Sequence, residues 1–229
     1  MCYHASIAAT YQQLSDAYDR PFDGEFPSFN DLNQAVAPRV SGFEFPLLPI
    51  ITAEKPSSIQ CYRWGLIPPW AKDFNEAKEI RMHTLNARSE TMYEKPAFKN
   101  AVQSQRCLVP LTGFFEWQHP NSKTKIPYFI GLAQQEIFSV AGIYESWLNP
   151  LDNNIINSFS LLTTDANEVM ATIHNTKKRM PVVLLKSQEE NWLKPNLKKE
   201  EAMKLCTPIA SSLMKFQVLS NPTPQLKLL

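Results

Sequence analysis

The first residues of the chain could do chemistry that few other positions allow. The sequence begins Met1-Cys2-Tyr3-His4, and a small second residue is what lets a methionine aminopeptidase remove Met1. Removal would leave Cys2 with a free α-amine beside its own thiol, and these groups titrate near pH ~7.7–8 and ~8.5. An aldehyde can form a Schiff base with such an amine, and the sulfur can then close a stable five-membered thiazolidine. Most cysteines at position two have no such role, so other residues must support this one.

Residues 113–117 place one carboxylate among large aromatic side chains. Glu116 follows Phe114 and Phe115 and directly precedes Trp117. Surroundings that exclude water raise the pKa of a carboxyl group, which lets it donate and accept protons near pH 7. A glutamate at such a position can instead be a buried structural residue that binds a backbone amide. The sequence leaves both roles open.

His174 and the basic residues after it form a second candidate group. The histidine follows an expected helix at 169–173 and lies a few residues before Lys177, Lys178 and Arg179. A neutral imidazole beside phosphate-binding cations can donate or accept a proton near pH 7. A lone histidine at the end of a helix is otherwise more often a hydrogen-bonded structural residue.

Two further segments carry side chains suited to a nucleic-acid strand. Within 85–91, Asn86 offers both a hydrogen-bond donor and an acceptor, and Arg88 offers a planar fork that suits phosphate. A helix cap with an exposed ion pair would explain the same residues. Trp64 and Trp70 flank a proline turn, which can hold an indole rigidly enough for a base to stack on it. Core packing accounts equally well for Trp64.

The composition is that of an ordinary folded domain and excludes several classes of protein. The 229 residues are 44% hydrophobic and 20% charged, which suffices for one substantial core. No apolar run approaches a membrane span and no signal peptide is recognisable, so we expect a cytoplasmic protein without a membrane partner. The four cysteines and four histidines are scattered and form no C-x-x-C. We therefore expect no metal, no cofactor and no disulfide framework.

The net charge of +1 hides a gradient along the chain. Residues 1–60 hold three basic and seven acidic side chains, a net of −4, whereas residues 174–199 hold seven basic and two acidic ones, a net of +5. A nearly neutral protein is not suited to indiscriminate nucleic-acid binding, but it can carry one basic groove. A solvated face without a ligand is the simpler interpretation of the same charges.

The expected elements are many short strands with helices inserted between them. The chain has 18 prolines and only 6 glycines, a ratio that suits short elements and rigid connections. Helices are expected at 11–18, up to 173 after the N-cap chemistry of 164–167, and from 189–192 onward. Strands are expected at 60–66, 106–109, 128–131, 137–144, 159–163 and 182–185, with strand edges and turns over 35–51. We therefore expect one α+β domain, 1–229, around a curved, barrel-like, mostly antiparallel sheet with short flanking helices.

Several short motifs occur in a fixed order that is typical of one family. They are Met1-Cys2, R-W-G-L-I-P-x-W at 63–70, N-A-R-S-E-T at 86–91, R-C-L-V-P-x-x-G-F-F-E-W at 106–117, A-G-I-Y-E at 141–145, T-T-x-A-N at 163–167, I-H at 173–174 and R-M-P-V-V-L at 179–184. In this order they resemble the SRAP family, the SOS-response-associated peptidases or abasic-site processing proteins. The resemblance covers about residues 1–220.

The resemblance implies a protein that binds single-stranded DNA and reacts with the ring-opened aldehyde of an abasic site through Cys2. The product would be a thiazolidine DNA–protein crosslink that protects the lesion in the SOS response to DNA damage. The resemblance also implies that Glu116 is the acid/base residue for Schiff-base formation and reversal. It implies that His174 protonates the deoxyribose ring oxygen or assists ring opening, and that Asn86 holds the amine and the sugar in register. Removal of Met1 is attributed to autoproteolysis in this family, which explains the peptidase label.

The same resemblance implies contacts to the DNA strand. Arg88 and Arg179 match phosphate-contacting positions, and Trp70 matches a stacking or wedge residue. The common form places the arginine two residues after the histidine, whereas four residues intervene here. Lys177 or Lys178 could therefore serve in place of Arg179.

The start of the chain also departs from the common pattern. Many family members begin Met-Cys-Gly-Arg, but this chain has Tyr3 and His4. A bulky Tyr3 changes the space around the Cys2 nucleophile. His4 would give a phosphate contact that is weaker than an arginine's and that depends on pH.

Three functions from different classes are consistent with the sequence. The first is an enzyme that crosslinks abasic single-stranded DNA through Cys2, as a monomer associated with the nucleoid when bound to DNA. The second is an N-terminal-nucleophile amidohydrolase or peptidase, in which Cys2 attacks a carbonyl and its α-amine is the base. Such an enzyme would turn over an amide without DNA. The third is a non-catalytic reader of damaged DNA, for which Cys2→Ala would bind as well as wild type and no covalent species would form.

Overall fold

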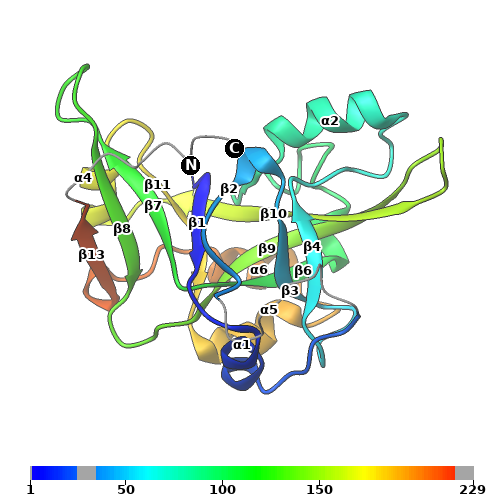
Figure 1. Cartoon of the computed structure of the whole chain (residues 1–229), viewed down its shortest axis with the longest axis horizontal. Helices are drawn as coiled ribbons and strands as arrows, with labels where there is room; N and C mark the ends of the chain where they lie inside the picture. Colours follow the sequence, from blue (N-terminus) through cyan, green and yellow to red (C-terminus); the bar gives the residue numbers. More distant parts are fainter. Residues whose placement is uncertain (1, 25–34, 220–229) are drawn as a thin grey trace.

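Short helices are interspersed among strands along the chain in the computed structural model, which describes residues 2–24 and 35–219 (Figure 1). The helices are α1 (Tyr11–Tyr18), α2 (Phe74–His83), α3 (Ala101–Ser104), α4 (Glu168–Ile173), α5 (Lys186–Leu193) and α6 (Lys199–Leu205), with 3₁₀ turns η1 (Gly42–Glu44) and η2 (Ser211–Leu213). The strands are β1 (His4–Ile7), β2 (Ala37–Ser41), β3 (Leu47–Thr52), β4 (Gln60–Trp64), β5 (Asn86–Arg88), β6 (Arg106–Leu111), β7 (Gly113–Gln118), β8 (Ile126–Leu132), β9 (Phe138–Leu148), β10 (Ile155–Asp165), β11 (Arg179–Pro181), β12 (Val183–Leu184) and β13 (Met214–Val218). None of these helices is long and apolar enough to cross a membrane.

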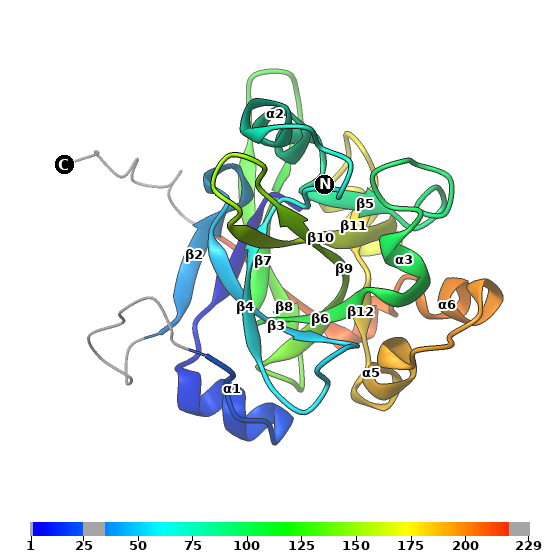
Figure 2. The same ribbon diagram turned by 90° about the vertical axis from the view of Figure 1, so that its right-hand side faces the viewer.

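Five strands close into a barrel. In the order β10-β4-β3-β6-β9 each strand is hydrogen-bonded to the next, and the pairing of β9 with β10 completes the ring (Figure 2). β9 and β10 are each 11 residues long. The end of β9 and the start of β10 form the hairpin that extends from the body of the molecule in Figure 1. All six residues of β6 are buried, as in strands that are covered on both faces. Trp64, from β4, is also a core residue, because its side chain is fully buried and stacks on Phe159.

A second sheet has the order β13-β8-β7-β1-β2 and is antiparallel throughout. β1 lies inside this sheet, since His4 is opposite Phe115 of β7 on one side and opposite Ser41 of β2 on the other. In an antiparallel pair, each step back along one strand is a step forward along the other. Cys2, two residues before His4, is therefore directed toward the part of β7 that carries Glu116.

The fold class predicted from the sequence is confirmed, including the barrel-like sheet and the short flanking helices. The pairings of β10 with β4 and with β5 are parallel and the other strand pairs are antiparallel. The helix predicted at 11–18 has these limits, with Thr10 as its N-cap. The helix that ends at Ile173 begins at Glu168, and its N-cap Asn167 accepts the N–H of Met170. The predicted strands are present, with ends displaced by a few residues.

Other elements differ from the predictions. Asn86–Arg88 is a strand that pairs with β10, so the helix-cap interpretation of this segment is wrong. Helices α2, α3 and α6 and strands β1, β5, β7, β11 and β13 were not predicted. The N-cap of α2, Asp73, is a recognisable start signal, but only Ala77 and Arg81 of this helix are buried. Such a helix lacks the apolar periodicity on which helix prediction depends.

Arg106 connects the ends of two helices to the barrel through hydrogen bonds. Its side chain is 0% exposed, although a charged group is rarely buried without partners. The guanidinium donates hydrogen bonds to five main-chain carbonyls, those of Val102, Gln103, Trp192, Lys194 and Pro195. These carbonyls lie at the ends of α3 and α5, so one side chain at the start of β6 fixes both helices.

We predict that Arg106→Met lowers the free energy of unfolding by about 2–4 kcal/mol, because it leaves buried carbonyls without donors. Arg63→Met is the matched control, since Arg63 is exposed and makes one long hydrogen bond to the carbonyl of Phe45. The control should stay within about 0.5 kcal/mol of wild type. Urea denaturation followed by tryptophan fluorescence measures both variants. Equal stability of the two variants would contradict the anchoring role of Arg106.

Candidate functional site

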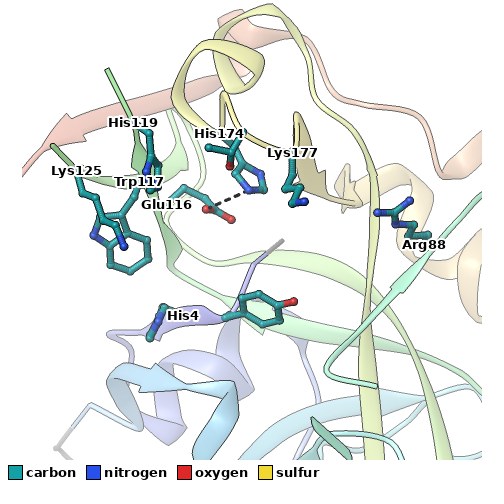
Figure 3. Close-up of a pocket in the computed structure, with 10 residues that line it drawn as sticks. His4, Arg88, Glu116, Trp117, His119, Lys125, His174 and Lys177 are labelled. Carbon is teal, nitrogen blue, oxygen red and sulfur yellow. Dashed lines mark ion pairs between the residues drawn. The ribbon is translucent and has the colours of Figure 1, made fainter. Parts of the chain in front are cut away.

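A cavity of about 540 Å³ opens at the start of β1 and the end of β7 (Figure 3). Its lining residues come from the N-terminal segment, β5, β7, the β7–β8 loop and the segment after α4; they are Tyr3, His4, Arg88, Glu116, Trp117, His119, Lys125, His174, Thr176 and Lys177. Figure 3 shows Lys125 and Trp117 on one side of Glu116, and Lys177 and Arg88 on the other. Since Glu116 is the one acidic side chain in this lining, the cavity favours an anionic ligand.

Glu116 and His174 face each other across the cavity (Figure 3). Glu116 is on β7, and His174 is the residue that ends α4. The imidazole Nε2 lies 3.9 Å from the carboxyl Oε2, and each side chain is 7% exposed. This distance is longer than a hydrogen bond, so the two groups are neighbours that can both reach one reacting atom.

Burial sets the protonation of this pair. It raises the pKa of Glu116 to about 7 and lowers the pKa of His174, because a dry environment disfavours the charged form of either group. His174 Nδ1 lies 2.8 Å from the carbonyl oxygen of Arg179 and 3.4 Å from its N–H. The shorter contact requires Nδ1 to carry the proton, since a carbonyl only accepts. Nε2 then accepts, and near neutral pH Glu116 is the group with a proton to give.

Arg179 is an internal anchor for His174. Its side chain is buried and its guanidinium binds Glu90 at 2.6 and 2.9 Å, Asp165 at 2.8 Å and the carbonyl of Thr163 at 2.7 Å. Burial alone would raise the pKa of Glu90, but its bonds to Arg179 lower it. The guanidinium that the sequence suggested for phosphate contact is thus held by carboxylates. The main-chain carbonyl of Arg179 orients the imidazole of His174.

Lys177 and Lys178 extend from the loop between His174 and Arg179. Both are exposed, and Lys177 lines the cavity. Lys178 has a φ of 49°, and its N–H donates to the carbonyl of His174 at 2.8 Å. The four-residue interval that departs from the common motif therefore forms a closed turn that directs one lysine to the cavity.

Cys2 directly precedes the lining residue Tyr3 but does not itself line the cavity, and its main chain is held in place. The Nδ2 atom of Asn86 donates to the carbonyl oxygen of Cys2 at 2.9 Å, and both residues are buried. The Oδ1 atom of Asn86 is buried without a hydrogen-bond partner among the residues that the structure describes. Burial raises the pKa of the Cys2 thiol, and the nearby Glu116 carboxylate raises it further. The thiol is therefore neutral at pH 7.

A second cavity, of about 480 Å³, adjoins the first. Arg88 lines both, and Trp70 and Asn86 line the second together with Lys95 and Phe98. Trp70 is 46% exposed, so its indole is accessible from solvent. The predicted residues Arg88 and Trp70 thus lie along one continuous region that begins beside Cys2.

His4 lies at the first cavity, where its ring meets Trp117 edge-on at 5.1 Å. Burial lowers the pKa of His4, and the positive charge of Arg39 lowers it further. His4 is therefore neutral at pH 7, and a charged contact to phosphate would need a lower pH.

The sequence did not point to four residues of the lining. Trp117 was noted as a neighbour of Glu116 but not as a wall of the cavity. His119 and Lys125 belong to the β7–β8 loop, and Thr176 to the turn after α4. The polar turn sequence after Gln118 was a usable signal for a loop, but its proximity to His174 depends on the strand order.

No group of three or more histidine, cysteine, aspartate or glutamate side chains arranged to hold a metal ion occurs within 2–24 and 35–219. The four cysteines carry free thiols. Cys107 and Cys206 are buried and Cys61 is partly buried.

Comparison with known proteins identifies relatives over most of the chain. A protein from Bacillus subtilis (strain 168) named abasic site processing protein YoqW is 40% identical over 174 residues, which cover 76% of this chain and 70% of the relative. YoaM, another abasic site processing protein of that organism, is 37% identical and covers 85% and 80%. The abasic site processing protein HMCES of Xenopus tropicalis is 31% identical, and the match covers 80% of this chain and 58% of that protein.

Solved structures of proteins with a similar fold are also found. A crystal structure of a protein from Bacteroides thetaiotaomicron has a TM-score of 0.88 and 39% identity, covering 96% of this chain and 93% of that one. A protein from Bordetella bronchiseptica, with a TM-score of 0.80 and 20% identity, shares the fold. The family described as SOS response associated peptidase (SRAP) matches residues 1–222. This chain therefore belongs to the SRAP family.

Proposed function

We propose that this protein processes abasic sites in single-stranded DNA by forming a thiazolidine crosslink through Cys2. The observation that carries the proposal is the position of Cys2. Asn86 holds its main chain at 2.9 Å, and the Glu116–His174 pair lines the adjoining cavity. The names of the relatives indicate the substrate class, and the basic lining suits a phosphate backbone.

The α-amine of Cys2, free after removal of Met1, starts the reaction. It adds to the aldehyde carbon of the ring-opened sugar, and a proton moves from nitrogen to oxygen to give a carbinolamine. Protonated Glu116 donates its proton to the departing hydroxyl, which leaves as water, and an iminium ion remains. The Cys2 thiol then adds to the iminium carbon, and its proton returns to Glu116. One water is lost overall, and the carboxyl group ends in its starting state.

The thiol need not be ionised before this last step. Burial keeps it neutral, so the amine is the group that attacks first and the carboxylate left by the first proton transfer removes the thiol proton. His174, whose Nε2 carries no proton in this tautomer, takes the proton of the anomeric hydroxyl and returns a proton to the ring oxygen as the C–O bond of the sugar ring breaks. Arg88 and Lys177 on one side and Lys125 on the other contact the flanking phosphates, and Trp70 stacks on a base further along the strand.

Removal of Met1 precedes this chemistry, because an acylated nitrogen cannot form the imine. Either a methionine aminopeptidase removes it, or Cys2 and Glu116 remove it in an autopeptidase reaction, as the family label suggests. Expression of Glu116→Gln protein separates the two routes, since an aminopeptidase would process this variant as it does wild type.

We predict a covalent complex that depends on both Cys2 and the lesion. Protein lacking Met1, incubated with a single-stranded oligonucleotide that bears one abasic site, should give a retarded band on a denaturing gel. Cys2→Ala protein should give none without reductant. Because that variant keeps an α-amine but cannot close the ring, borohydride should trap its Schiff base.

Two controls make this test specific. An undamaged strand should give no band, and Cys61→Ala, which removes a partly buried thiol elsewhere in the chain, should react like wild type. Protein without Met1 that binds the abasic strand but never forms a covalent species would be a damage reader. Hydrolysis of an amide by Cys2 without DNA would favour the amidohydrolase function.

We predict a bell-shaped dependence of the crosslinking rate on pH. Glu116 is protonated below its pKa of about 7 and loses this proton as pH rises, whereas the amine becomes nucleophilic only as pH rises through ~7.7–8. The rate should therefore peak near pH ~7.5 and fall on both sides. Glu116→Gln should lower the rate by about 10²–10⁴-fold and abolish the fall at high pH.

Glu168→Gln is the matched control for this variant, because Glu168 is an exposed carboxylate on α4, the helix that ends at His174. It should keep the wild-type rate and profile. A Glu116→Gln variant with a rate and pH profile equal to those of the control would exclude Glu116 as the acid. Single-turnover rates from quenched samples between pH 5.5 and 9 measure all three proteins.

A further inference from the structure

Tyr3 occupies the position next to the nucleophile and lines the cavity of about 540 Å³. Its main chain is fixed, because the carbonyl oxygen of Tyr3 accepts the N–H of Gly42 at 2.8 Å. Its ring is supported by Phe43, with the ring centroids 4.9 Å apart and the planes tilted by 37°. Phe43 is itself 44% exposed. The pair is thus an aromatic surface held in place beside Cys2.

The Tyr3 side chain has a face available for a ligand. Its ring is only partly buried, and its hydroxyl makes no hydrogen bond to the residues within 2–24 and 35–219. Burial raises the pKa of the phenol, the charge of Glu116 raises it further and that of Arg88 lowers it. The phenol is therefore neutral at pH 7, which suits contact with an uncharged aromatic ring.

We propose that Tyr3, supported by Phe43, stacks on the nucleobase that neighbours the abasic sugar. This inference rests on the proposed function, because the reacting sugar must lie at Cys2. Tyr3 directly follows Cys2 and lines the same cavity as Glu116, so a sugar that is bound to Cys2 and reached by Glu116 lies within reach of the Tyr3 ring. That sugar has no base, and the nearest π-face of the strand belongs to the adjacent nucleotide. Stacking on an aromatic side chain is the sequence-tolerant contact that single strands use.

Binding of a non-reactive strand tests this role independently of the crosslink. One oligonucleotide carries a tetrahydrofuran abasic analogue between two adenines. A second carries three consecutive tetrahydrofuran units, so that no base adjoins the central sugar. Fluorescence anisotropy at fixed salt gives the two dissociation constants. Wild type should bind the adenine-flanked strand about 5- to 100-fold more tightly, the range expected for stacking of one base.

Three variants distinguish stacking from other roles of Tyr3. Tyr3→Phe keeps the ring and should keep the wild-type ratio of the two dissociation constants. Tyr3→Leu should reduce the ratio toward one, and Phe43→Leu should reduce it in part. Neither leucine variant should change the affinity for the strand without neighbouring bases, whereas a folding defect would weaken both strands. Strands with a base on one side only identify which neighbour is stacked.

Two results would overturn the proposal. One is a Tyr3→Leu variant that keeps the wild-type ratio, which would show that the ring contacts no base. The other is a Tyr3→Phe variant that loses as much as Tyr3→Leu, which would assign the contact to the hydroxyl and a phosphate. Absence of any crosslink to a natural abasic strand is a separate result. It would contradict the thiazolidine chemistry and leave these binding ratios to decide the role of Tyr3.

Discussion

The pairing of β1 on both of its edges is the constraint on which the site depends. A chain terminus is ordinarily poorly ordered, yet Cys2 must be placed to within a fraction of an ångström if its amine and thiol are to meet one carbon atom. Here β7 and β2 hold the strand from His4 onward, and Asn86 binds the carbonyl of Cys2 at 2.9 Å. Cys2 thus directly precedes a strand that is paired on both edges, and its own carbonyl is hydrogen-bonded.

The same sheet determines the electrostatics of the site. β7 carries Glu116 into a dry position where the pKa of the carboxyl rises to about 7, and α4 ends with His174 opposite it. The charges that fix this geometry are kept away from the reacting atoms, since Arg179 binds Glu90 and Asp165 with its guanidinium and His174 with its carbonyl. In the proposed mechanism, proton transfer is left to Glu116 and His174, whose charged forms are both disfavoured by burial.

The sequence indicates candidate site residues more readily than it indicates their arrangement in space. Cys2, Glu116 and His174 are recognisable because their residue types and neighbours restrict what they can do, and the short strands follow from local apolar patterns. The strand order could not be derived, so nothing local indicated that Asn86 meets a carbonyl 84 positions away. Glu90, which binds the guanidinium of Arg179, is likewise 89 positions away in the chain, and no local pattern indicated this ion pair.

Tandem mass spectrometry of the digested crosslink tests the thiazolidine most directly. Nuclease and protease treatment should yield a modified peptide that begins at Cys2 and carries the sugar remnant, with a mass one water lower than the sum of its parts. Fragmentation should locate the modification on the first residue. A modified peptide that retains Met1, or one modified at Lys125 or Lys177, would contradict the role of the N-terminal aminothiol.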